Sequence, residues 1–217
     1  MLASLSLWID PIDRTGPENM AVDEWLWQQM STPLLRVYRW RGAWISIGYF
    51  SQAPDVLGDC EMVRRPTGGG IVDHRNDWTY TLLIPRGLKL AEMPGAQSYQ
   101  VIHRALASVL AAEGHAARLT DSEDVGDAAY CFTHPVVHDL VDVAGQKIAG
   151  AGQRRGRTGL LHQGSVALST LDHAARGIAL AELLALAYMP IEKAPSESEI
   201  EELCRRKYRH PDWNYKR

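Results

Sequence analysis

The sequence predicts an α+β fold in which a mixed, mostly antiparallel sheet is backed by helices. Most β-rich runs follow one another through short turns, whereas a doubly wound fold needs a helix between successive strands. From Leu171 onward the character changes to helical segments, with Pro190 and Pro195 between them. The 217 residues fit one domain that can bury a sizeable core.

The first fifty residues predict a strand, a helix and a hairpin. The run from Ser4 to Ile9 alternates weakly, as a strand does. A helix should begin at the capping box Thr15–Glu18, which carries a proline in its first turn. Its buried stripe should consist of Val22, Leu26 and Met30. The runs Leu34–Trp40 and Ala43–Tyr49 are separated by Arg41-Gly42, which favours a β-hairpin.

The middle of the chain predicts further strands and one amphipathic helix. Strands at Glu61–Arg65 and Trp78–Ile84 should flank a glycine-rich loop. A helix is expected over Ser98–Glu113, ended by Gly114. Three later runs suit a meander of strands, at Val136–Val143, Lys147–Gln153 and Gly159–Leu168.

Two helices should complete the chain, at Asp172–Tyr188 and Ser196–Tyr208. We expect one domain over residues 1–217, with a core over about 1–190, a helical tail over about 191–217 and no accessory domain.

Composition excludes several classes of protein. The sequence is 46% hydrophobic and 23% charged, which is ordinary for a globular chain. A net charge of −3 does not favour a nucleic-acid binder. The longest apolar run, Ile178–Met189, contains Glu182 and is too short to span a bilayer. With no signal-peptide pattern and three cysteines in no framework spacing, a cytoplasmic protein without nucleic-acid or membrane partners is expected.

The most informative segment runs from Arg64 to His74, with the sequence Arg-Arg-Pro-Thr-Gly-Gly-Gly-Ile-Val-Asp-His. Three glycines allow positive φ and close backbone approach to a ligand. Adjacent N–H groups and the two arginines can bind an anion. The loop is neither a Walker loop nor a dinucleotide-binding fingerprint. Alone, it fits equally well a glycine turn beside two solvated arginines.

A second segment resolves that choice. It contains Tyr130-Cys131-Phe132, then Gly145-Gln146-Lys147-Ile148-Ala149-Gly150-Ala151-Gly152-Gln153, then His162-Gln163-Gly164-Ser165. With the glycine loop, these motifs resemble the lipoate–protein ligase and octanoyltransferase family, distant relatives of biotin–protein ligases. Asn19–Glu24 also resembles the family's first helix, so the resemblance covers nearly the whole chain in the right order.

The resemblance implies a biotin-synthetase-like fold and assigns site residues. The substrate-binding residues it implies are Arg64, Arg65, Thr67, Gly68, Gly69, Gly70, His74, Gly150 and His162. Lys147 matches the family's lysine that contacts the acyl carbonyl. In acyl transfer such an ammonium can stabilise the developing oxyanion. Without the resemblance, Lys147 would be an exposed hairpin lysine whose removal costs little stability.

Cys131 distinguishes between two mechanisms. Its thiolate would be favoured by nearby His134, His138 or Lys147, although most free cysteines are buried small hydrophobes. A Cys-Phe pair just before the Gly-x-Lys hairpin resembles the cysteine-dependent octanoyltransferases, whereas ATP-dependent ligases more often show Asn-Asp in this region. Cys60 and Cys204 lie near no motif and are interpreted as structural.

Other residues stay open at this point. His74 and His162 can serve either chemistry or structure, and no cluster has zinc-site spacing, so no metal is expected. The cluster Arg154, Arg155 and Arg157 is a solvated turn or a docking patch for acidic partners. An acyl channel or simple core packing explains a set of apolar residues, namely Trp40, Trp44, Ile47 and Tyr49.

The resemblance implies an acyltransferase that modifies the lysine of a lipoyl-domain protein, either a glycine-cleavage H protein or a 2-oxoacid dehydrogenase E2. In one mechanism Cys131 takes octanoyl from an acyl carrier protein and no cofactor is needed. In the other, ATP and Mg activate lipoate as an adenylate. A biotin ligase is less favoured because Gly-Arg-Gly-Arg is missing. A non-enzymatic binding module would not need the loop, Lys147 and Cys131 together.

Overall fold

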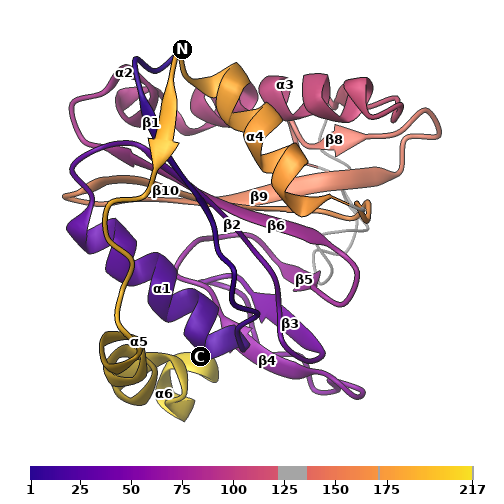
Figure 1. Ribbon diagram of the computed structural model, residues 1–217. Coiled ribbons are helices and arrows are strands. Elements are labelled where there is room, and N and C mark those ends of the chain that lie inside the picture. Colours follow the sequence, from indigo (N-terminus) through magenta and orange to yellow (C-terminus); the bar gives the residue numbers. More distant parts are fainter. Residues whose placement is uncertain (122–135, 171, 217) are drawn as a thin grey trace.

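The computed structural model describes residues 1–121, 136–170 and 172–216. A large sheet has the strand order β11-β1-β2-β6-β10-β9-β8-β7, and a smaller sheet has the order β4-β3-β5 (Figure 1). The large sheet comprises β1 Leu5–Ile9, β2 Leu34–Tyr38, β6 Trp78–Pro85, β7 Arg118–Leu119, β8 Leu140–Val141, β9 Lys147–Arg155, β10 Gly159–Val166 and β11 Tyr188–Pro190. The small sheet comprises β3 Trp44–Ile47, β4 Glu61–Arg64 and β5 Ile71–Asp73.

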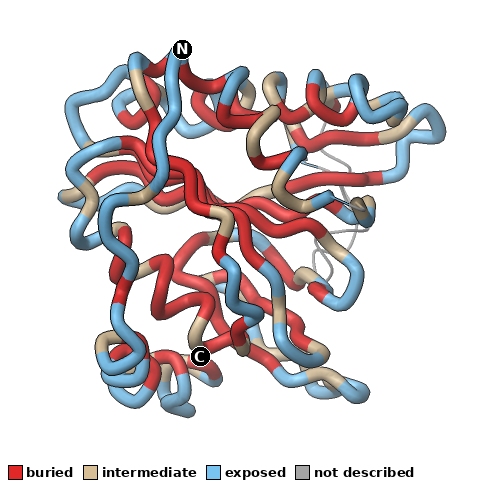
Figure 2. The backbone as a smooth tube through the Cα atoms, viewed as in Figure 1, coloured by how far each residue is buried: buried red, intermediate tan, exposed pale blue. Residues whose placement is uncertain are grey.

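Helices cover both faces of the large sheet (Figure 1). The helices are α1 Gly16–Gln29, α2 Lys89–Glu92, α3 Gly95–Ala112, α4 His173–Leu184, α5 Glu197–Leu203 and α6 Pro211–Asn214, with a π-helical turn at Cys204–Tyr208. In the view of Figure 1, α3 and α4 lie above the sheet, and α1 lies below it beside the small sheet. Figure 2 shows the sheet as the buried layer between them.

Most strand pairs are antiparallel, which confirms the predicted fold class. From β2 through β6, β10, β9 and β8 to β7, every neighbouring pair is antiparallel. Parallel pairing joins β1 to β11, β1 to β2 and β3 to β4. The predicted meander is therefore confirmed as β8-β9-β10, although β8 is only two residues long.

The predicted hairpin of residues 34–40 and 43–49 is wrong. Strand β2 pairs with β1 and β6 in the large sheet, whereas β3 pairs with β4 and β5 in the small sheet. Gly42 does adopt a positive φ of 93°, so a turn forms where the sequence indicates one. The turn carries the chain from one sheet to the other. Both edges of β2 are already paired, with β1 and with β6, so β3 cannot pair with it.

The predicted helix over Asp172–Tyr188 is too long. It begins as expected, because the Asp172 side chain accepts hydrogen bonds from the amides of Ala174 and Ala175. It ends at Leu184, and the exposed residues Tyr188–Pro190 add an edge strand parallel to β1. The helical tail is confirmed in type, since α5 starts at a capping box on Ser196 and leads into the π-helical turn.

Each face of the large sheet has its own hydrophobic core. Alternate residues of the central strands point to opposite faces, so Leu82 packs in one core and Leu83 in the other. The core under α3 and α4 includes Leu106, Leu110 and Leu180. The core under α1 includes Met20 and Val22 and extends to Tyr208 in the C-terminal segment. The tail residues thus contribute to a core instead of lying free.

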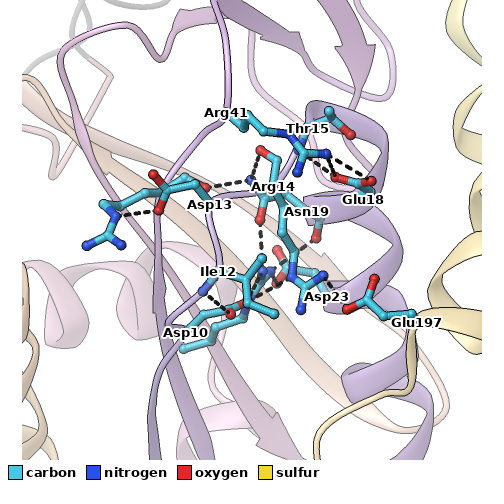
Figure 3. A network of polar contacts seen from close by, with 12 residues as sticks. Asp10, Ile12, Asp13, Arg14, Thr15, Glu18, Asn19, Asp23, Arg41 and Glu197 are labelled. Atoms are coloured by element: carbon cyan, nitrogen blue, oxygen red, sulfur yellow. Dashed lines mark hydrogen bonds and ion pairs between the residues drawn. The ribbon is translucent and has the colours of Figure 1, made fainter.

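A buried ionic network joins β1, α1 and β2. The Arg36 guanidinium lies 2.7 Å from Asp10 and 2.7 Å from Asp23, and all three side chains are fully buried. Arg36 also donates to the Asn19 Oδ1 at 2.8 Å. Figure 3 shows Asp10, Asn19 and Asp23 converging on this network. Because buried charges are tolerated only when they are paired, the network fixes how α1 sits on the sheet.

Candidate active site

A cavity lies between the large sheet, α1 and the small sheet. It brings together much of the two sequence motifs, since the glycine loop and β9 both contribute to its wall. Apolar and glycine residues form much of the lining, including Met20, Tyr38, Trp40, Gly69, Val72, Gly150, Ala151 and Gly152. The polar lining residues are Ser46, Arg65, His74, Thr79, Lys147, Gln163 and Ser165. Such a wall suits an apolar ligand with one polar end.

The glycine loop is held against the backbone of two strands. Gly69 has a φ of 94°, as the glycine run predicts. A Cβ on Gly48 would lie 1.6 Å from the Gly69 carbonyl oxygen, and one on Gly152 would lie 2.4 Å from that of Gly68. Glycine is therefore required at Gly48 and Gly152, against which the loop backbone packs, and Gly69 forms part of the cavity wall.

Replacing Gly69 by valine should weaken ligand binding by more than about 10-fold, because a β-branched residue is strained at positive φ and its side chain enters the cavity wall. Calorimetry with octanoate, the carboxylate of the acyl group that the family resemblance implies, measures the loss. Gly87→Val is the control, since Gly87 has a φ of 89° and open space around its Cβ position. Equal octanoate affinity in the Gly69 and Gly87 variants would show that the loop does not contact the ligand.

The two arginines of the loop bind backbone carbonyls. Arg64 is fully buried and donates to the carbonyls of Gly48, Ser51 and Asn214, which ties the C-terminal segment to the loop after β3. Arg65 lines the cavity and donates to Ser46 and to the carbonyls of Gly68 and Gly70. Both arginines therefore hold the loop in its shape. Only Arg65 of the two lines the cavity.

Thr67 connects the loop to the buried ionic network. Its hydroxyl donates to Gln163 Oε1 at 2.8 Å, and Gln163 Nε2 donates to Asp23 Oδ2 at 2.8 Å. Asp23 in turn pairs with Arg36. The glycine loop is thus anchored through β10 to α1, so its position depends on the core network.

His74 belongs to a buried hydrogen-bonded chain at the cavity. Its Nε2 lies 2.6 Å from Ser46 Oγ, and its Nδ1 lies 2.7 Å from Asp77 Oδ2. Arg65 also donates to Ser46 Oγ, at 2.7 Å. The ring also stacks on Trp40 at 3.9 Å between centroids. These contacts fix the orientation of the His74 ring.

Lys147 reaches the cavity from the first position of β9. Contrary to the expectation of an exposed hairpin lysine, it is buried, and its Nζ lies 2.7 Å from Asp139 Oδ2. Gly150 makes room for this arrangement, since a Cβ there would lie 2.6 Å from Lys147 Cε. The spacing Lys-x-x-Gly thus lets the lysine side chain lie across the strand backbone.

His162 lies away from the cavity lining. It is fully buried on β10, where its ring nitrogens contact the Tyr80 hydroxyl and the Gln153 side chain, each at 3.0 Å. Burial holds the pKa of His162 well below its usual range, so the ring is neutral. This placement argues for a packing role, and the expected ligand contact has no support from the geometry.

Of the remaining sequence candidates, some lie outside the described residues and others lie in the cores or at the cavity. Cys131, the expected nucleophile, lies outside the described residues, as do Tyr130, Phe132 and His134. Burial raises the pKa of Cys204 to about 12, which fits its structural interpretation. Of the four apolar residues considered for a channel, Trp40 lines the cavity. Trp44 and Ile47 pack in the cores, and Tyr49 packs against Phe50 and Trp213 outside the cavity lining.

Several site residues were missed at the sequence level, among them Ser46, Asp77, Tyr99, Asp139 and Gln163. Asp77 lies three residues after His74, a spacing that a turn can close. Asp139 lies within the first strand predicted for the meander, Val136–Val143, and directly before the observed β8, so it could have been paired with Lys147 across the turn to β9. Within the described residues, no group of three or more His, Cys, Asp or Glu side chains could hold a metal ion. In that same part of the chain no helix is long and apolar enough to cross a membrane.

Comparison with known proteins identifies the family. Residues 15–195 match the lipoyl protein ligase A/B catalytic domain. The chain belongs to this family. An octanoyltransferase LipM from Carboxydothermus hydrogenoformans is 32% identical over 175 residues, which are 74% of this chain and 64% of that protein. Another LipM, from Oceanobacillus iheyensis, is 35% identical over 165 residues, 70% of this chain and 59% of that protein.

These matches confirm the predicted resemblance. The matched region spans less than two thirds of either relative's own length.

Solved structures of the lipoyl ligase family share the fold. A lipoate-protein ligase A bound with ATP superposes with a TM-score of 0.74 at 20% identity, covering 99% of both chains. A bipartite lipoate protein ligase from Thermoplasma acidophilum gives a TM-score of 0.69 at 20% identity, over 99% of this chain and 96% of that one. This likeness confirms the expected mixed sheet backed by helices.

Proposed function

We propose that this protein is an octanoyltransferase that attaches an eight-carbon acyl group to the lysine of a lipoyl-domain protein in the cytoplasm. The donor is octanoyl-acyl carrier protein, and the acceptor is a glycine-cleavage H protein or a 2-oxoacid dehydrogenase E2. No cofactor is required. The observation that carries the proposal is the placement of the Lys147 ammonium in the wall of a mostly apolar cavity closed by the glycine loop.

The chemistry proceeds in two steps. The Cys131 thiolate attacks the donor carbonyl, forming an acyl-enzyme thioester and releasing the carrier thiol, which takes up a proton. The lysine amine of the acceptor then attacks the thioester, forming an amide and returning the proton to Cys131. In both steps the carbonyl oxygen becomes negative, and Lys147 donates a hydrogen bond to it. The described lining supports this role for Lys147, while Cys131 rests on the sequence motif.

The substrate-binding roles follow from the cavity. Gly150 leaves room for the Lys147 side chain, Gly69, Trp40 and Val72 form wall for the acyl chain, and His74 presents a fixed ring to the ligand. Gly68, Gly70 and Thr67 hold the loop in this shape. The relatives named octanoyltransferase LipM, at 32% and 35% identity, support the same choice of reaction.

The alternative is an ATP-dependent lipoate–protein ligase that forms a lipoyl-adenylate with ATP and Mg. That mechanism needs cations that hold a phosphate. The two arginines of the glycine loop, which the sequence offers for this purpose, donate to backbone carbonyls. These arginines thus serve the loop backbone, and the relatives named octanoyltransferase LipM favour the transferase.

The test uses an apo lipoyl domain and two donor mixtures. One contains octanoyl-acyl carrier protein without ATP, and the other contains lipoate with Mg-ATP. We expect the mass of the lipoyl domain to increase by one octanoyl group in the first mixture. Modification in the second mixture alone would assign the ligase reaction, and modification in neither would reject both.

A further inference from the structure

The structure assigns a positioning role to Asp139 and Tyr99, which hold the Lys147 side chain at the cavity in one orientation. Lys147 is thereby placed in advance to donate a hydrogen bond to the carbonyl oxygen of the substrate. The inference rests on the proposed acyl transfer. It concerns two residues that lie outside the sequence motifs and do not line the cavity.

Asp139 is the centre of the arrangement. Its side chain is fully buried, and its Oδ2 lies 2.7 Å from Lys147 Nζ. The same oxygen accepts a hydrogen bond from the Val136 amide at 2.9 Å, and Oδ1 accepts one from the Tyr99 hydroxyl. Three contacts therefore fix the Asp139 side chain in place as the partner of Lys147.

Tyr99 connects this carboxylate to the strand that carries the lysine. It comes from α3 and is buried, and its hydroxyl oxygen accepts from the Ala151 amide of β9 at 2.8 Å while donating to Asp139. The Tyr99 ring packs on His103 at 4.1 Å between centroids. The helix, the carboxylate and β9 are thus joined at one point, which fixes Asp139 relative to Lys147.

His103 completes the support without adding charge. Its Nδ1 contacts the carbonyl oxygen of His138, the residue before Asp139, at 2.8 Å. Burial lowers the pKa of His103 to about 4, so the ring is neutral near pH 7. His138 itself has a φ of 72°, which is uncommon for a non-glycine residue. The segment before Asp139 is therefore held in one unusual conformation by a neutral partner.

The consequence for catalysis follows from the flexibility of lysine. A free lysine side chain samples many rotamers, and ordering it at each turnover would cost rate. The ion pair fixes the side chain in advance across Gly150, where a Cβ would clash with it. A donor held in this way suits the oxyanion that develops in acyl transfer.

Two variants test the inference in the full chain. In Asp139→Asn, which keeps the shape but loses the charge, kcat for octanoyl transfer should fall about 10- to 100-fold, as expected for a misplaced catalytic group. The KM for the donor should change by less than about 3-fold. In Tyr99→Phe, which keeps the buried ring, kcat should fall about 10-fold. The matched control is Tyr80→Phe, a buried tyrosine whose hydroxyl contacts His162 instead, and it should retain wild-type kcat.

A purely structural role would give a different pattern. In that case both Asp139→Asn and Tyr99→Phe would lower the melting temperature while kcat per folded molecule stayed at the wild-type value, and the inference would be overturned. If Asp139→Asn does not fold, as judged by circular dichroism, Tyr99→Phe decides between these outcomes.

A second measurement is independent of turnover. Cyanate modifies lysine amines that are free to react, so release of Lys147 from its ion pair with Asp139 should raise its carbamylation rate. We expect an increase of about 5-fold or more in Asp139→Asn relative to the exposed Lys89, measured by peptide mass spectrometry. Equal relative rates in the variant and the wild type would overturn the inference. This readout stands even if neither donor supports transfer, so its failure is distinct from failure of the proposed function.

Discussion

Replacement of Lys147 by alanine should lower octanoyl transfer by about 10²- to 10³-fold at saturating substrate, which is the loss expected for one oxyanion donor. The structure also implies a cost in stability, because the variant leaves the buried Asp139 without its cation. Breaking a buried pair in this way costs about 3–5 kcal/mol in the free energy of unfolding.

A paired variant separates the two effects. In Lys147→Met with Asp139→Asn, no uncompensated charge is left, so much of the stability should return while transfer stays low. Lys89→Ala, an exposed lysine on α2, should keep wild-type transfer and stability. Steady-state transfer to an apo lipoyl domain and urea unfolding give the two quantities. Near-normal turnover in the double variant would show that the reaction does not need Lys147.

Replacement of Arg36 by methionine should destabilise the protein by at least about 3–5 kcal/mol. Methionine fills similar space but leaves Asp10 and Asp23 buried without their shared cation. The free energy of unfolding of a native domain is about 5–15 kcal/mol, so the variant should lose much of its stability or fail to fold. Urea unfolding followed by circular dichroism measures the change.

Arg39→Met is the matched control. Arg39 pairs with Asp13 at 2.6 Å, but both side chains are about half exposed, at 47% and 48%. Exposed pairs of this kind contribute about 0–1 kcal/mol. If the Arg36 and Arg39 variants lost similar stability, the buried network would not be what fixes α1 on the sheet.

Local sequence signals predicted the elements better than their partners. The capping box at Thr15 and Glu18 located the start of α1, because both halves of that signal lie within four residues. The hairpin through Arg41-Gly42 was wrong because a turn signal does not say which sheet the next strand joins. Likewise, Tyr188–Pro190 carries apolar residues that fit a helix as well as an edge strand. The pairing partner β1 lies far away in the sequence and decides the outcome.

In the site, too, the sequence indicated individual residues but not their long-range partners. The family motif indicated Lys147, Gly69 and His74, and all three line the cavity. It could not show that Arg64 binds carbonyls of the C-terminal segment, because Asn214 lies 150 residues away. Nor could it show that Asp139 and Tyr99 converge on Lys147, since helix α3 and the turn before β8 meet only in the folded chain. Motifs specify residue types, whereas burial and pairing decide their roles.

The most direct test of the transferase is the state of Cys131 after mixing with octanoyl-acyl carrier protein in the absence of ATP. We expect the intact protein to gain one octanoyl group, located on Cys131 by peptide mapping and released by hydroxylamine. Cys60 and Cys204 should stay unmodified, and Cys131→Ser should form no adduct and lose transfer, because a serine hydroxyl is barely ionised near neutral pH. The contrary result is a fully active Cys131→Ser variant that releases pyrophosphate from ATP when lipoate is present.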